Sequence, residues 1–60
     1  MRGPAREIHV FWRDVAELVK LSGGIVAVTL MNGITYELLE AEVKDLIVLG
    51  QVMITRYHSG

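Results

Sequence analysis

An Asn-Gly pair at positions 32 and 33 lies between two apolar segments and constrains the fold more than any other feature of this sequence. The flanking segments are IVAVTL at 25–30 and ITYELL at 34–39. Asn-Gly between such segments is the strongest short-range signal for a β-hairpin, because a tight turn needs residues that adopt a positive φ. The sequence therefore predicts an antiparallel hairpin over 25–39.

Two registers of this hairpin fit the turn. A two-residue loop pairs Met31 with Ile34 and places Glu37 among aliphatic residues. A three-residue loop ending at Gly33 separates an apolar face from a polar one, and a slip by one residue would invert both faces. We therefore predict the three-residue loop, with Gly33 in the left-handed conformation. Its pairs are Leu30 with Ile34, Val28 with Tyr36, Val26 with Leu38, Thr29 with Thr35 and Ala27 with Glu37.

The segment before the hairpin has apolar residues at the i, i+3, i+4, i+7 spacing of an amphipathic helix. These positions are Ile8, Phe11, Trp12, Val15, Leu18 and Val19. Ser22-Gly23-Gly24 follows, and glycine commonly ends a helix in the left-handed conformation. We therefore predict a helix over 5–21. An alternative makes Ile8–Trp12 a strand, because IHVFW is rich in residues that favour strands, and begins a shorter helix at Asp14.

The segment after the hairpin also has two interpretations. Apolar residues at helical spacing, followed by Gly50 as a C-cap, favour a short helix over 41–49. The run LIVL is also typical of a short buried strand, which would make Lys44-Asp45 a turn. Beyond it, apolar alternation over 51–58 indicates a final strand that completes the sheet.

We therefore predict an α+β fold with one domain over residues 1–60. It comprises an N-terminal amphipathic helix, an antiparallel hairpin, a short helix and a final strand, giving a three-stranded sheet. The alternative is a small barrel in which the N-terminal helix precedes four or five short strands.

The apolar content is high for so short a chain. A domain of this length buries only about 60% of its unfolded surface, yet 52% of the 60 residues are hydrophobic and no cysteine is present to form a disulfide. The spare apolar surface predicts a homo-oligomer. The predicted interface residues are Trp12, Ile25, Met31 and Leu39.

The polar residues carry no motif for catalysis. His9 and His58 lack a further ligand at metal-binding spacing, and the acidic residues between 37 and 45 are typical of a solvated helix face. We expect a protein that is not an enzyme and has no cofactor, metal or small-molecule substrate. No segment has the roughly 18 consecutive apolar residues of a membrane span, and the absence of cysteine agrees with a cytoplasmic location.

A formal net charge of −1 means that nucleic-acid binding would need a local basic patch. On the predicted N-terminal helix, three cations share the solvated face, and a fourth lies in the final strand beside two aromatic residues. The predicted contacts are Arg6, Arg13, Lys20 and Arg56 for phosphate, and Tyr57 and His58 for bases. We predict a homo-oligomeric module that binds RNA or DNA. The alternative is a protein-interaction or assembly module that does not bind nucleic acid.

The pattern Val26-x-Val28-x-Leu30-x-x-Gly33-x-x-Tyr36, after a predicted helix, resembles the first motif of the Sm and Hfq-like RNA-binding proteins. The resemblance covers residues 6–38 and implies a small helix-plus-barrel subunit that assembles into rings. Leu38 stands where that family has a glycine, and its uridine-binding stretch has no counterpart here. Residues 33–50 are also similar to short phage-type proteins in which a hairpin strand leads into a helix.

Overall fold

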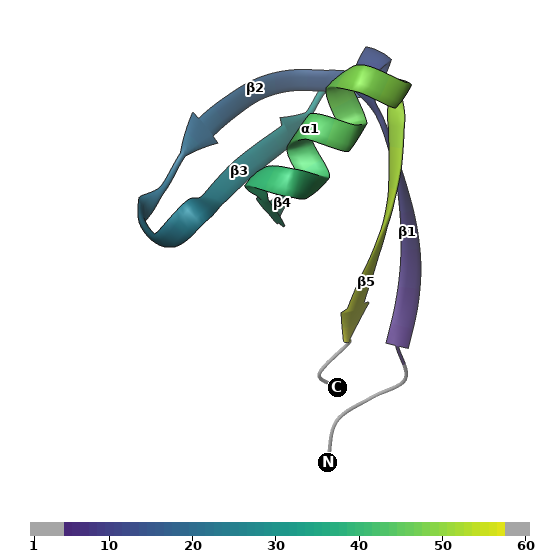
Figure 1. Ribbon diagram of the computed structural model, residues 1–60. Helices are drawn as coiled ribbons and strands as arrows, with labels where there is room; N and C mark the ends of the chain where they lie inside the picture. The colour runs from purple at the N-terminus through teal and green to yellow at the C-terminus, as the bar shows by residue number, and fades with distance from the viewer. Residues whose placement is uncertain (1–4, 58–60) are drawn as a thin grey trace.

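The computed structural model describes residues 5–57, of which 58% lie in strands (Figure 1). Five strands, one α-helix and two short 3₁₀ turns follow one another along this part of the chain. In order they are β1 (Ala5–Phe11), η1 (Trp12–Asp14), β2 (Val15–Lys20), η2 (Ser22–Gly24), β3 (Ile25–Leu30), β4 (Thr35–Leu39), α1 (Glu40–Leu49) and β5 (Gln51–Tyr57).

The strands form two antiparallel sheets. One is a two-stranded ribbon of β1 and β5, and the other has the order β2-β3-β4. The predicted α+β fold with an N-terminal helix is therefore wrong, because the residues assigned to that helix form β1, η1 and β2. The predicted three-stranded sheet is also wrong in its composition, because β5 pairs with β1 and not with the hairpin. The alternative barrel shares the same error, since it too begins with a helix.

Burial in the N-terminal segment follows strand alternation. Val10, which the helical pattern leaves out, is fully buried, whereas Trp12 and Val19, which it includes, are exposed. The alternative interpretation correctly placed a strand before Trp12, but the shorter helix that it began at Asp14 is wrong, because β2 occupies that place. The glycines after β2 do not end a helix. They form η2, in which Gly23 has a φ of 76° and the chain reverses from β2 into β3.

The β3–β4 hairpin has the predicted register. Val26 pairs with Leu38 and Val28 with Tyr36. The three-residue loop is also confirmed, because the backbone N–H of Gly33 donates to the carbonyl of Leu30 at 2.9 Å and Gly33 has a φ of 91°. In addition, Asn32 Oδ1 accepts a hydrogen bond from the N–H of Ile34 at 2.9 Å, which fixes the turn on its other side. The prediction errs in one detail, since Ile34 is exposed.

Gly33→Ala is expected to destabilise the protein by about 1 kcal/mol, because a Cβ is disfavoured at positive φ. A Cβ built on Gly33 meets no atom within 4 Å, so the whole effect should come from the backbone. Urea denaturation checks it. Gly33→Asn is the control and should lose less, since asparagine tolerates this conformation. Full stability of the alanine variant would contradict the positive φ of the turn.

The predicted helix over 41–49 is confirmed as α1, which begins one residue earlier. At its N-terminus the Glu42 carboxylate accepts a hydrogen bond from the backbone N–H of Leu39 at 2.9 Å, which satisfies a donor that the helix itself cannot pair. Gly50 ends the helix in the left-handed conformation with a φ of 78°, as a C-cap. The strand interpretation of this segment is wrong.

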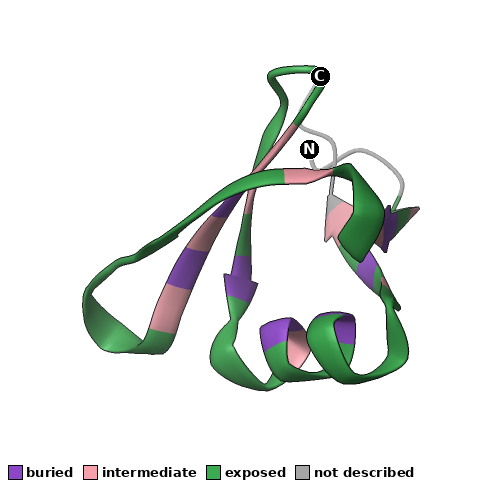
Figure 2. Cartoon of the chain, turned by 90° about the horizontal axis from the view of Figure 1, so that it is seen from above, coloured by how far each residue is buried: buried purple, intermediate pink, exposed green. Residues whose placement is uncertain are grey.

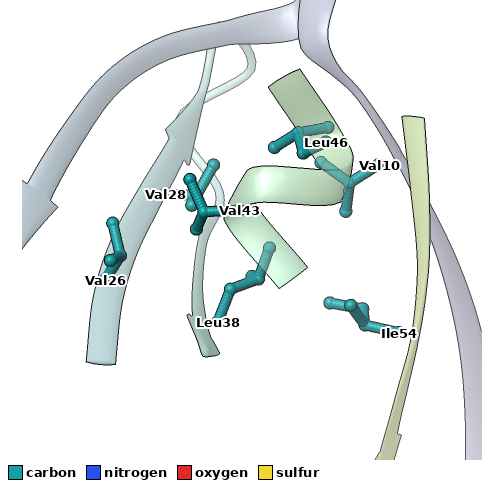
Figure 3. Close-up of a cluster of buried hydrophobic side chains, with 7 residues drawn as sticks. All are labelled: Val10, Val26, Val28, Leu38, Val43, Leu46 and Ile54. Atoms are coloured by element: carbon teal, nitrogen blue, oxygen red, sulfur yellow. The ribbon is translucent and has the colours of Figure 1, made fainter. Parts of the chain in front are cut away.

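The core lies where α1 meets both sheets (Figure 3). Seven buried apolar side chains form it: Val10, Val26, Val28, Leu38, Val43, Leu46 and Ile54. Figure 3 shows those of β1 and β5 on one side of the helix and those of β3 and β4 on the other. The helix packs against β3, β4 and β5. It thus covers the apolar face of the hairpin.

Candidate functional site

The three cations predicted to share one face of an N-terminal helix do not form the basic stripe that this helix would have presented. Arg6 lies on β1, Arg13 in η1 and Lys20 near the end of β2, so the three cations belong to three different elements. The stripe depended on a helix that would have placed them on one face. Lys20 instead lies beside the start of α1, where its Nζ is 3.4 Å from Glu40 Oε2 on the protein surface. Such an exposed pair contributes little to stability.

Arg56 contacts the chain itself rather than open solvent. Its guanidinium donates hydrogen bonds to the backbone carbonyls of Glu37, on the outer edge of β4, and of Thr55. Its Nη2 also lies 3.8 Å from Glu42 Oε1 at the start of α1. Arg56 therefore joins β5 to the three-stranded sheet and to the helix, and its side chain is only 36% exposed. Of the two predicted base contacts, Tyr57 is the last residue of β5 and His58 lies outside the described residues.

The outward face of the β1–β5 ribbon carries an ordered column of side chains that the sequence analysis did not identify. His9 and Phe11 alternate with the buried Val10 and so face away from the core. Their rings are stacked, with centroids 4.4 Å apart and an interplanar angle of 27°. The guanidinium carbon of Arg13 lies 4.8 Å from the Phe11 centroid. We call His9, Phe11 and Arg13 the stacked column.

The predicted interface residues divide between two ends of the molecule. Ile25 pairs with Leu39 at the base of the hairpin. Met31, at the hairpin tip, instead lies close to η1, because its N–H donates to the carbonyl of Asp14 at 2.8 Å. Trp12, like Asp14, belongs to η1. Trp12 and Met31 therefore lie at the same end of the molecule, away from Ile25 and Leu39.

The last turn of α1 reaches the same end of the molecule (Figure 1). The N–H of Trp12 donates to the carbonyl of Gly50 at 3.0 Å, which holds the helix terminus against η1. Val48 is 70% exposed, and Leu49 and Met31 are each 67% exposed. We call Trp12, Met31, Val48 and Leu49 the apolar end. A helix turn whose exposed side chains are apolar usually packs against another surface.

Residues 5–57 contain no group of three or more His, Cys, Asp or Glu side chains that could hold a metal ion, and no buried polar side chain. A depression of about 300 Å³ lies at the apolar end, lined by Asp14, Leu30, Met31 and Asn32. It has a single carboxylate, so general acid–base chemistry by a pair of groups has no basis there.

No helix within the described part of the chain is long and apolar enough to cross a membrane. Comparison with protein-family models, with curated proteins and with solved structures finds no match for this chain. The resemblance to Sm and Hfq-like proteins therefore stays a prediction, and the helix that it places before the hairpin is not formed.

Proposed function

We propose that this chain is a small, non-catalytic module that assembles with further copies of itself through the apolar end. The observation that carries the proposal is the distribution of apolar side chains over residues 5–57. Eleven large ones are exposed and seven apolar residues are buried, and Figure 2 shows how little of the chain is buried. These exposed side chains supply the apolar surface that a further copy would bury.

The charges at the apolar end support a second copy as the occupant. Arg13 and Asp14 are adjacent and exposed in η1, between Trp12 and the hairpin tip. In a two-fold contact each surface meets itself. Arg13 of one copy can then approach Asp14 of the other while the apolar side chains are buried between them. The two opposite charges make this end self-complementary.

Leu49→Lys is expected to weaken self-association by at least about tenfold, because a charge at the centre of an apolar contact loses hydration without gaining a partner. Sedimentation velocity over a range of protein concentrations measures the change. Leu39→Lys is the matched control. Leu39 is also a well-exposed leucine, at 55%, but lies at the far end of the hairpin, so this variant should associate like the wild type.

Two outcomes would contradict the proposal. One is a wild-type protein that stays monomeric at the highest concentration reached. The other is an equal effect of both lysine variants, which would remove the apolar end as the place of contact. Thermal unfolding of each variant, followed by circular dichroism, shows whether a change in mass comes from a change in folding.

A further inference from the structure

We infer that the stacked column binds single-stranded nucleic acid, with a base stacked on one of its two end planes. These are the outer face of the His9 ring and the outer face of the Arg13 guanidinium, because the Phe11 ring between them is covered on both sides. The site lies on the outward face of the β1–β5 ribbon. It shares Arg13 with the contact proposed between copies, so it is tested at a protein concentration at which single copies prevail. It is also distinct from the basic stripe expected from the sequence, because it uses only one of those cations, Arg13.

The backbone places the column before any ligand arrives. Strand alternation puts positions two apart on one face, so His9 and Phe11 are neighbours along β1. Arg13 follows at the same spacing in η1, where its guanidinium lies over the Phe11 ring. Across the ribbon, the Gln51 side-chain oxygen Oε1 lies 2.5 Å from His9 Nε2 and holds the imidazole. Little side-chain freedom then remains to be lost on binding.

The chemistry of the column selects the class of ligand. A nucleobase is a planar ring that stacks on aromatic side chains and on guanidinium planes. The Arg13 guanidinium also has N–H donors for a phosphate in the same ligand. A base in a duplex has its faces covered by its neighbours, so the column favours a single strand. Glu7 and Asp14 are exposed near its two ends and will reduce the affinity for a polyanion.

Fluorescence anisotropy of a labelled eight-nucleotide oligouridine tests the site, with the protein held at one low concentration. Arg13→Lys keeps the charge but removes one planar end group. Phe11→Leu keeps an apolar side chain but removes the ring against which both end groups pack. We expect each variant to weaken binding by about 5- to 100-fold, the range that loss of one stacked base produces. Binding by the wild type should weaken as salt increases, because phosphate contacts release counterions.

Lys44→Gln is the control, since Lys44 is an exposed cation on α1 and belongs to neither strand of the ribbon. It should bind like the wild type. The inference is overturned if wild-type protein does not bind, if Lys44→Gln weakens binding as much as Arg13→Lys does, or if a duplex of the same length binds equally well. The Leu49→Lys variant of the otherwise wild-type protein tests the two proposals separately. It should reduce self-association and leave the affinity of each stacked column for the oligonucleotide unchanged.

Discussion

Leu46→Ala is expected to destabilise the protein by about 2 to 5 kcal/mol, the usual range for truncating a buried leucine. Leu46 is fully buried on α1, where it faces the contact between the helix and both sheets. The shell around it comes from several elements, so the cavity cannot be closed by a shift of one strand. A chain of this size has a total stability of only about 3 to 9 kcal/mol. Much of the variant should therefore be unfolded at 37 °C, which thermal denaturation measures.

Ile47→Ala is the control for this prediction. Ile47 is the next residue of the same helix and is half-exposed, so its truncation leaves no cavity. The loss should stay below about 1 kcal/mol, because little apolar area returns to water and alanine favours the helix. Equal losses for the two variants would mean that α1 does not present Leu46 to the core.

Arg56→Gln is expected to lower the free energy of unfolding by about 1 to 2 kcal/mol. The change removes a charged donor to the carbonyl of Glu37, and such hydrogen bonds contribute about 1.5 to 3 kcal/mol. The expected loss lies at or below the lower end of that range, because the Arg56 side chain is partly exposed to solvent. Urea denaturation should show the loss, and part of it should persist at high salt, because the carbonyl acceptor carries no net charge.

Arg6→Gln is the matched control, since Arg6 is the direct partner of Arg56 in the β1–β5 pair. Like charges opposite each other in a sheet are unfavourable. Removing Arg6 should therefore leave stability unchanged or slightly raised. Unchanged stability of Arg56→Gln together with a loss of oligonucleotide binding would instead favour the phosphate contact that the sequence predicts.

The hairpin and the helix after it could be predicted because their signals are local. Asn32 and Gly33 determine the turn from their own conformational preferences, and the polar Glu37 excludes the other register. Gly50 marks the end of α1 in the same way. In each case the information lies within a few residues of the element that it specifies.

The N-terminal segment could not be assigned in this way, because its pairing partner is at the other end of the chain. Val10 lies against β5, paired with Val52, and nothing near Val10 in the sequence indicates that partner. Without it, the spacing of Ile8, Val15 and Leu18 fits a helix equally well. The apolar residues of β2 add to the ambiguity, since both faces of this strand are exposed and no alternation of burial is needed there.

The candidate sites were predicted only in part. Trp12 and Met31 were predicted at an interface, and both lie at the apolar end. Val48 and Leu49 were correctly predicted to be helical, but they were not among the predicted interface residues. The stacked column has a sequence signal, the alternation of His9, Phe11 and Arg13, which becomes visible only if this segment is taken as a strand. The contact of Arg56 with β4 has no sequence signal, because it depends on how the two sheets approach each other.

The pairing of Ala5 with Tyr57 closes nearly the whole described chain into one loop. Bringing together ends about fifty residues apart costs roughly 3 to 4 kcal/mol of chain entropy, from the (3/2)RT ln n relation. The β2-β3-β4 sheet requires only short loops, so almost all of this cost falls on the β1–β5 ribbon. The outward face on which the stacked column lies is thus part of the ribbon whose formation loses the most chain entropy.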